Sequence, residues 1–353
     1  MNILITGGAG FVGSNLAINF KGENSVAKVV CLDNLKRRGS ELNLARLEAN
    51  GIQFIHGDVR CKEDLEAIRD IDVVIDASAE PSVLAGVSGS IHEVFNNNLV
   101  GTINCLELAR KLGSIFVFLS TSRVYPIVAL ESLPIVESET RYKLTEVMSN
   151  NGFSERGISE QFSLEGARSY YGATKLASEL MINEYNFLSG VKSVINRCGV
   201  ISGPWQMGKV DQGVVVLWMA RHYWKQKLAY IGYGGSGKQT RDILNVKDLY
   251  RLVKWQIENI EKVNGQTFNV GGGLRNSASL LELTTICSEI TGNTILIDRI
   301  MENRTADIKL YLTDNSKVTA ATGWAPQIGI HETLLEIHEW ISKNESILTK
   351  ILS

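Results

Sequence analysis

The sequence of 353 residues is poor in cysteine and has no large excess of charge of either sign. Its five cysteines lie far apart without a C-x-x-C pair, which argues against a disulfide framework or a zinc site and favours a reducing cytoplasm. The net charge of −2 gives no basic surface for nucleic acid. No run approaches the ~18 apolar residues of a membrane span, and the chain starts with a strand pattern rather than a signal peptide. We therefore expect a cytoplasmic protein that contacts neither membrane nor nucleic acid.

Short apolar runs alternate with helical patterns up to about residue 197. Such alternation predicts a parallel sheet covered by helices on both faces. Beyond that point the regularity breaks, although QTFNVGGG resembles one late strand. We expect a doubly wound α/β domain over residues 1–196, joined by about 241–272, and a smaller α/β substrate-binding lobe over 197–353, interleaved with it. The expected strands are 2–6, 28–33, 52–57, 72–77, 115–120 and 193–198, and the expected helices include 11–21, 62–70 and 94–113.

Four glycines follow the first expected strand, in the stretch TGGAGFVG. Gly7, Gly10 and Gly13 fit G-x-x-G-x-x-G, and Gly8 with the last two fits G-x-G-x-x-G. After a first strand, such glycines allow a tight turn and close approach of the backbone to a pyrophosphate, which the next helix N-terminus binds. This position predicts a dinucleotide site of the Rossmann type rather than an ordinary glycine-rich loop.

The second expected strand ends at Asp33, twenty residues after Gly13. A carboxylate there binds the ribose hydroxyls and repels a 2′-phosphate, which favours NAD over NADP. The following cations, at positions 36–38, leave NADP open as an alternative, unless they belong to a solvated loop. Asp58 follows the third expected strand, where a carboxylate reaches an adenine amine.

The stretch SYYGATK places Tyr171 and Lys175 four residues apart, on one face of a helix. A free tyrosine has a pKa of ~10, and a neighbouring ammonium is expected to lower the pKa of Tyr171. The phenolate can then accept a proton from a sugar hydroxyl. FLSTSRVY supplies hydroxyl donors at the end of the fifth expected strand, where such sheets bind ligands.

The glycine motif, Asp33, Asp58, NNNLVGT, STSRVY and YGATK together resemble the extended short-chain dehydrogenase/reductases that act on nucleotide sugars, over nearly the whole chain. The resemblance implies a catalytic set of Thr121, Tyr171 and Lys175. It also implies cofactor contacts at Gly7, Gly10, Phe11, Val12, Gly13, Asp33, Asn34, Asp58, Val59, Ala77, Ser78, Asn98, Tyr171 and Lys175. ASAEPSV takes the place of the family's cofactor-contacting loop and puts Glu80 where relatives have a glutamine or another residue.

The choice of reaction depends on the two residues after Thr121. The dehydratase branch of this family has an Asp-Glu pair there, whereas this chain has Ser122 and Arg123, and arginine cannot act as a general acid at neutral pH. The segments containing DQG and GKQTRD resemble the CDP-tyvelose (CDP-paratose) 2-epimerases. That resemblance makes Arg241 a diphosphate ligand, because a guanidinium fork suits two phosphate oxygens. The implied substrate contacts, with Asp211 beside them, are Glu80, Ser122, Arg123, Lys209, Gln212 and Arg241.

These features predict an NAD-dependent epimerase acting at C2 of a CDP-linked deoxy sugar, with no metal. The alternatives are a 4-epimerase or 4-reductase of another nucleotide sugar, and a non-catalytic NAD-binding sensor. The polar insertion at 129–169 is expected beside the active site, as a lid or a substrate-recognition loop. A homodimer is expected through helices at about 94–112 and 170–188. The apolar residues proposed for that contact are Leu106, Leu108, Leu176, Leu180 and Met181.

Overall fold

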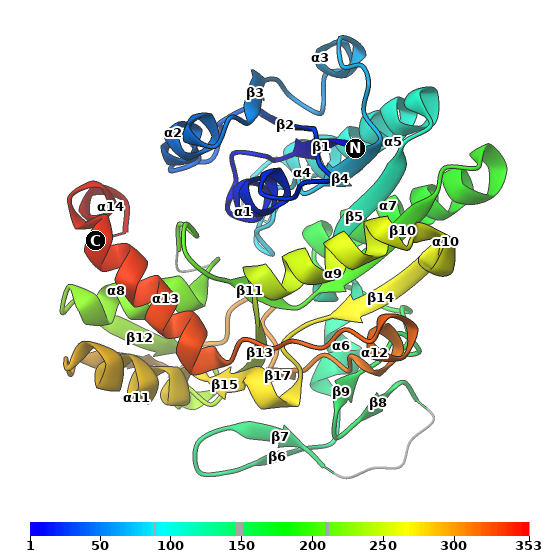
Figure 1. The fold of residues 1–353 in the computed structure, drawn as a ribbon. Coiled ribbons are helices and arrows are strands. Elements are labelled where there is room, and N and C mark those ends of the chain that lie inside the picture. The colour runs from blue at the N-terminus through cyan, green and yellow to red at the C-terminus, as the bar shows by residue number, and fades with distance from the viewer. Residues whose placement is uncertain (88, 146–150, 209–211, 353) are drawn as a thin grey trace.

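The computed structural model describes residues 1–353 except 88, 146–150, 209–211 and 353. Its centre is a seven-stranded parallel sheet in the order β14-β10-β5-β4-β1-β2-β3 (Figure 1). The strands are β1 (Asn2–Thr6), β2 (Lys28–Asp33), β3 (Gln53–His56), β4 (Val73–Asp76), β5 (Ile115–Thr121), β10 (Ser193–Cys198) and β14 (Gln266–Val270). The expected doubly wound α/β fold is therefore confirmed, and the chain order reverses between β1 and β4.

Helices cover both faces of this sheet, because its strands are apolar on both sides. Ile3 and Ile5 of β1 pack in the core beneath α1, α2 and α9, whereas Leu4 packs in the core beneath α3, α5 and α7. The bounds are α1 (Phe11–Lys21), α2 (Leu42–Ala49), α3 (Lys62–Glu66), α5 (Gly101–Leu112), α7 (Tyr170–Ser189) and α9 (Val246–Glu258).

The helix expected over 94–113 consists of three parts. It begins as α4 (Ile91–Phe95), passes through a π-helical turn (Asn96–Val100) and continues as α5. The helix expected over 62–70 ends at Glu66, after little more than one turn. No helix in the described part of the chain is long and apolar enough to cross a membrane.

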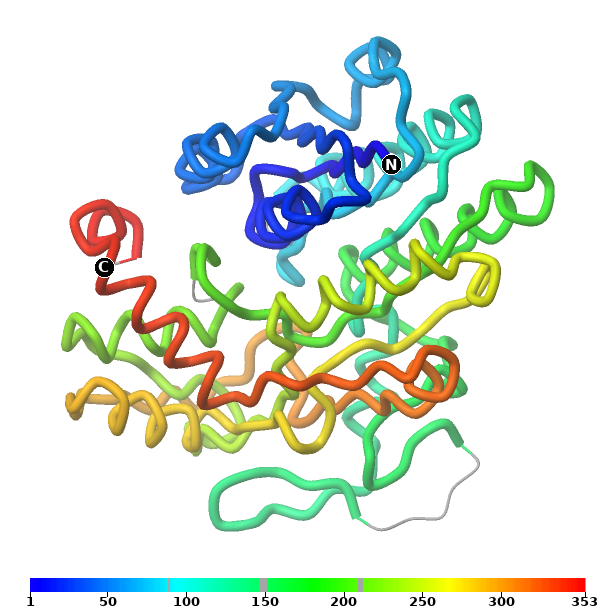
Figure 2. Tube along the Cα trace, in the orientation of Figure 1, coloured from blue at the N-terminus to red at the C-terminus, as the bar shows by residue number. Residues whose placement is uncertain are grey.

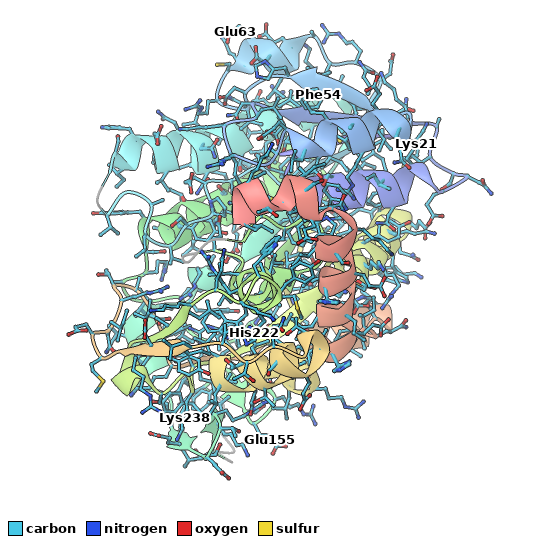
Figure 3. All side chains as sticks on the ribbon, turned by 90° about the vertical axis from the view of Figure 1, so that its left-hand side faces the viewer. Lys21, Phe54, Glu63, Glu155, His222 and Lys238 are labelled. Atoms are coloured by element: carbon cyan, nitrogen blue, oxygen red, sulfur yellow. The ribbon has the colours of Figure 1, made fainter. Side chains whose placement is uncertain are left out.

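The C-terminal lobe is built on a second, four-stranded sheet and a separate strand pair. Its core gathers apolar residues of α8, α11 and α13, among them Val216 and Leu334. His222 of α8, whose position Figure 3 labels, is also buried. The strands are β11 (Val200–Ser202), β13 (Thr240–Asn245), β15 (Ser277–Ser279), β17 (Leu310–Tyr311), β12 (Leu228–Ile231) and β16 (Ile297–Ile300). The helices are α8 (Val214–Tyr223), α11 (Leu280–Thr291), α13 (Ile330–Lys343) and α14 (Glu345–Leu352).

The chain passes between the two parts more than once. After α8 and β12 in the lobe, α9 and α10 (Ile260–Val263) return to the first sheet and β14 becomes its edge strand (Figure 2). The last segment begins with α12 (Ser316–Thr322), whose Val318 packs in the core of the first sheet, and then re-enters the lobe at α13.

The insertion at 129–169 does not cover the active site in the part that the structure describes. It forms the end of α6 (Ile127–Glu131) and two hairpins, and none of its described residues lines the main cavity. Leu130, Ile158 and Phe162 instead pack against Ile308 and Tyr311 of the lobe. The hairpins are β6 (Ile135–Glu137) with β7 (Tyr142–Leu144) and β8 (Phe153–Ser154) with β9 (Gly157–Ile158).

Figure 3 shows Glu155 of this insertion at the opposite end of the molecule from Glu63 of α3. The described residues of the insertion thus form no lid on the wall of this cavity, and a role of the segment in substrate recognition stays a prediction. The segment is polar on average, so its composition did not indicate this placement. Its few apolar side chains pack against the lobe and attach the segment there.

Candidate active site

One cavity of about 1040 Å³ runs from the glycine turn after β1, along the carboxyl ends of the parallel strands, to the lobe. This is the edge at which open α/β sheets bind ligands. Its walls come from both parts of the chain, since residues of β12, β13 and α8 line its far end. The same cavity therefore contains expected cofactor contacts and expected substrate contacts.

The glycine turn leaves no room for side chains. A Cβ on Gly13 would lie 2.2 Å from the carbonyl oxygen of Gly7, and a Cβ on Gly7 would lie 2.7 Å from the carbonyl oxygen of Ala77. Gly7 also has a φ of 64°, which favours glycine. Its carbonyl accepts a hydrogen bond from the amide of Gly10 at 3.0 Å, just before α1 begins. The bare backbone and the free N-terminus of α1 fit a pyrophosphate.

Asp33 lies on the cavity wall beside this turn. Its carboxylate accepts hydrogen bonds from the amides of Ala9 at 3.1 Å and Leu35 at 2.8 Å. Burial raises the pKa of Asp33, and these amide hydrogen bonds oppose the rise. This placement suits a ligand of ribose hydroxyls.

Asp58 is held outside the cavity wall by Arg60 and Asn34. The hydrogen bond from Arg60 lowers the pKa of Asp58 to about 2. Arg60 and Val59 line the cavity instead, so Asp58 reaches an adenine only if its pairing with Arg60 changes. A direct contact of Asp58 with the cofactor stays a prediction.

The three cations after Asp33 already have protein partners. Lys36 forms an ion pair with Glu93, and Arg37 donates hydrogen bonds to the side chain of Gln212 and to the carbonyl of Met207 at 3.4 Å. Arg38 donates to the carbonyl of Lys350 in α14 at 2.8 Å. Only Lys36 has a carboxylate partner, and all three residues line the cavity, so these contacts do not by themselves distinguish NAD from NADP.

Behind the cavity, buried polar residues hold the loop that follows β4. Asn98, in the π-helical turn, accepts from the amide of Glu80 at 2.7 Å and donates to the carbonyl of the same residue at 3.1 Å. It also donates to Thr174 of α7 at 3.2 Å. Asn98 therefore does not line the cavity; it fixes the loop that carries Ala77, Ser78 and Glu80, which do.

The hydroxyls of Thr121 and Tyr171 meet in the cavity. Thr121 is the last residue of β5, and Tyr171 lies in the first turn of α7, which Ser169 caps by accepting a hydrogen bond from the amide of Gly172 at 3.1 Å. The side chain of Thr121 is close enough to Tyr171 to act on the pKa of its hydroxyl. Both residues line the cavity, as the sequence predicted.

Lys175 lies behind Tyr171 rather than on the cavity wall. It is buried, with its ammonium 3.9 Å from the centroid of the Phe118 ring. Burial lowers the pKa of Lys175, and the carboxylates of Asp76 and Glu179 oppose that effect.

The pKa of Tyr171 differs from the sequence prediction. Burial raises the pKa of Tyr171 to about 12, and the hydrogen bond with Thr121 and the charge of Arg123 oppose the rise. Lys175 is not among the groups that contribute most to the pKa of Tyr171. Its ammonium lies over the ring of Phe118 and interacts with the carboxylate of Asp76. In the protein alone, Tyr171 is therefore protonated at neutral pH.

The substrate side of the cavity contains most of the residues expected there. Glu80, Ser122, Arg123, Gln212 and Arg241 all line it. Two further predictions, positions 209 and 211, lie outside the described residues. These side chains place both positive and negative charge near Tyr171.

Several cavity residues escaped the sequence analysis. Arg304 and Asp307, in the segment before β17, line the cavity, and Asp307 accepts from Arg241 at 3.0 Å. Lys227, directly before β12, and Asp298 of β16 also line it. The sequence offered only one sign of Arg304 and Asp307 as site residues, namely their spacing of three in a segment without helical pattern. Such pairs are common in loops.

Comparison with known proteins agrees with this arrangement. Residues 3–271 match the NAD dependent epimerase/dehydratase family. The chain is 32% identical to the CDP-paratose 2-epimerase of Salmonella typhi, over 97% of this chain and 99% of that protein. It is 26% identical to a dTDP-glucose 4,6-dehydratase of Streptomyces niveus, over 98% of this chain and 94% of that protein.

A solved structure extends the comparison to the fold and the cofactor. The UDP-glucose 4-epimerase of Thermus thermophilus in complex with NAD matches with a TM-score of 0.77 at 25% identity, covering 97% of this chain and 99% of that one. The glycine turn and Asp33 of the present chain fit the same cofactor. The chain therefore belongs to the NAD dependent epimerase/dehydratase family, with NAD as its cofactor.

Proposed function

We propose that this enzyme inverts C2 of a CDP-linked deoxy sugar. The observation that carries the proposal is a single cavity joining the glycine turn, the hydroxyls of Thr121 and Tyr171, and the Arg241–Asp307 pair. A nucleotide sugar meets these groups when its sugar lies at the hydroxyls and its diphosphate at the arginine. The identity of 32% to a CDP-paratose 2-epimerase supports the choice of nucleotide and carbon.

The site residues divide the chemistry between them. NAD, when bound, supplies a hydride acceptor that returns the same hydride. Thr121 donates a hydrogen bond to the sugar oxygen, and Tyr171 accepts the hydroxyl proton and later gives it back. Lys175 adds positive charge behind Tyr171, and the Asn98 hydrogen bonds hold the Glu80 loop against the sugar.

The residues after Thr121 disfavour dehydration. Ser122 and Arg123 line the cavity at the positions where a dehydratase of this family needs a pair of acids. A guanidinium stays protonated and cannot transfer protons to and from carbon at neutral pH. A non-catalytic sensor is disfavoured because it has no need for hydroxyls of Thr121 and Tyr171 close together in the cavity.

We also propose the organisation in which this activity operates. Residues 1–196 form the NAD-binding domain together with α9, α10 and β14 of the expected segment 241–272, and most of the rest of 197–353 forms the substrate-binding lobe. The position of β14 in the first sheet supports this division, whereas β13, at the start of that segment, pairs within the lobe, and Val318 of α12 packs in the first core. The enzyme is a cytoplasmic homodimer, supported by five unpaired cysteines and by exposed apolar residues on α7.

The dimer surface differs from the one first expected. Leu106 and Leu108 are buried in the core of the first sheet and cannot contact a second copy. On α7, the side chains of Leu180 and Phe187 are 61% and 84% exposed. Pairing α7 with its copy across a two-fold axis would cover them.

Incubation of the purified enzyme with CDP-, UDP-, GDP- and dTDP-linked sugars, followed by proton NMR, tests the proposed activity. We expect inversion at C2 of a CDP-linked deoxy sugar. A product inverted at C4, or a 4-keto-6-deoxy product, would contradict the proposal. Tyr171→Phe is the matched variant: it should keep bound NAD and lose about 10²- to 10⁴-fold in turnover, because only the proton acceptor is removed.

A further inference from the structure

Arg123 and Arg241 both donate hydrogen bonds to the segment 306–308, and Ala306 and Asp307 of this segment line the cavity. Arg241 donates to Asp307 Oδ1 at 3.0 Å and to the carbonyl of Ile308 at 2.6 Å. Arg123 donates to the carbonyl of Ala306 at 3.3 Å, next to Asp307. Among the described residues no carboxylate lies within ion-pair distance of Arg123, although this side chain lines the cavity. A guanidinium has five N–H donors, so Arg123 retains both charge and donors for an anionic ligand.

The backbone of Arg123 is fixed beside the reacting hydroxyls. Its amide donates to Thr121 Oγ1 at 3.2 Å. Its carbonyl oxygen packs on Gly172 in the first turn of α7, so closely that a Cβ on this glycine would lie 2.1 Å from it. The backbone of Arg123 thus contacts both Thr121 and the first turn of α7, which carries Tyr171. Its side chain reaches the carbonyl next to Asp307.

The electrostatics of Arg123 agree with this position. Burial lowers the pKa of Arg123 to about 10, the charge of Arg241 lowers it as well, and Asp307 and Tyr171 oppose both effects. Arg123 therefore remains charged at neutral pH. It lies within electrostatic reach of Arg241, the expected diphosphate ligand, and of the hydroxyl of Tyr171.

This bridging position bears on which sugar carbon reacts. The diphosphate of a nucleotide sugar is attached to C1, so C2 is the neighbouring ring carbon and C4 lies across the ring. When the cation that holds the phosphate is also next to Tyr171, the carbon brought to Tyr171 is the one nearest the phosphate. We propose that Arg123 binds the phosphate attached to the sugar and thereby places C2, rather than C4, beside Tyr171. This inference rests on the proposed function and adds the residue that selects the carbon.

Binding of CDP and CMP to the NAD-loaded enzyme, measured by calorimetry, tests the assignment. CMP lacks the terminal phosphate, which is the one attached to the sugar in a CDP-sugar. We expect Arg123→Met to weaken CDP binding by about 10- to 100-fold, as for loss of a charge-assisted hydrogen bond, and to leave CMP binding unchanged. Arg69→Met is the matched control, because Arg69 donates to the carbonyl of Ile68 at 2.8 Å and does not line the cavity.

Arg123→Lys keeps the assignment testable if the methionine variant fails to fold. It retains the charge but not the planar fork, so CDP binding should fall by a smaller factor, again without a change for CMP. Equal losses for CDP and CMP, or no loss for either, would overturn the role of Arg123. Inversion at C4 by the unaltered enzyme would overturn the proposed function and the placement of C2, whatever the CDP and CMP affinities show.

Discussion

The hydroxyl of Tyr171 lies where burial and charge act in opposite directions. Burial raises the pKa of Tyr171 to about 12, while the hydrogen bond with Thr121 and the charge of Arg123 favour the phenolate. A lower proton affinity makes the phenolate more abundant at neutral pH and hence the base more effective. The groups that oppose burial therefore control the rate at a given pH.

We predict that Thr121→Val moves the acidic limb of the profile of kcat/KM against pH to higher pH. The hydrogen bond with Thr121 lowers the pKa of Tyr171, so its loss raises that pKa and reduces the phenolate fraction at each pH below it. Thr121→Ser keeps a hydroxyl and should leave the limb in place. A limb that stays unmoved in the valine variant would show that Thr121 does not act on Tyr171.

We predict that Gly13→Ala weakens NAD binding by about 1–3 kcal/mol, as expected for overpacking against rigid backbone. The added Cβ would lie 2.2 Å from the carbonyl oxygen of Gly7, so the turn must open. Gly329→Ala serves as the control, because no heavy atom lies within 4 Å of a Cβ there. NAD released from denatured protein is the measurement, and equal NAD content in both variants would contradict the close-approach argument.

At the residue level, the sequence located positions on the cavity wall where the signal is local. Gly7, Gly13, Tyr171 and Thr121 stand in short motifs with fixed spacing, and all four line the cavity. The pairing of Arg241 with Asp307 joins residues 66 positions apart, and no local pattern marks it. The pKa of Tyr171 was missed because burial, which sequence spacing does not report, dominates it.

At the scale of elements, α7 links the reacting hydroxyls to the buried core. Tyr171, Lys175 and Glu179 lie four residues apart along one face of this helix. Glu179 accepts from the guanidinium of Arg197 in β10 at 2.7 Å and from the hydroxyl of Ser120, the residue before Thr121. This pair ties α7 to both strands that end at the site.

We predict that Glu179→Gln lowers the free energy of unfolding by about 3–5 kcal/mol, because it leaves the buried charge of Arg197 unpaired. Both side chains of the pair are at most 7% exposed. The control is Glu261→Gln, which breaks an ion pair with Lys192 whose side chains are 47% and 72% exposed, and should cost less than about 1 kcal/mol. Urea titrations that give equal losses for the two variants would refute the distinction.

Elements with strong periodicity were the predictable ones. The expected strands and the helix at 11–21 agree closely with β1, β2, β10 and α1. The insertion at 129–169 has short strands and mixed composition, so its docking on Ile308 and Tyr311 depends on contacts between distant segments. Periodicity carries no information on such contacts.

At the scale of the whole molecule, side chains of the loop after β2 hold the two parts together around the cavity. Arg37 reaches Gln212 and Arg38 reaches α14, both in the C-terminal part. In addition, the guanidinium of Arg46 in α2 lies 4.1 Å from the centroid of the Trp205 ring. Arg37, Arg38 and Gln212 line the cavity together with Asp33, so the contacts of this loop join the two parts beside the expected cofactor site.

We predict that the protein is a dimer and that Leu180→Glu together with Phe187→Glu converts it to a monomer. A charge on each exposed apolar residue of α7 would be desolvated in a two-fold contact. Val136→Glu, at a side chain 49% exposed on the hairpin of the insertion, should leave the dimer intact. Light scattering at micromolar concentration is the measurement, and a monomeric unaltered protein would contradict the dimer.

Inversion at C2 has a chemical consequence that other routes do not share. In a 3-deoxy sugar, a ketone at C4 acidifies the hydrogens at C3 and C5 but not the one at C2. C2 can therefore be inverted only by oxidation at C2 itself, after which Tyr171 returns the proton to oxygen and the original hydrogen returns to carbon. Arg123 and Arg241 must hold the diphosphate while the sugar presents its other face.

The most direct test is epimerisation of a CDP-linked 3-deoxy sugar carrying deuterium at C2, followed by NMR of the product. The account predicts that deuterium remains at C2, and that a parallel reaction of unlabelled substrate in heavy water introduces none there. Solvent-derived deuterium at C2 of the product would contradict the account, because it would show that the carbon is inverted by exchange of a proton with water.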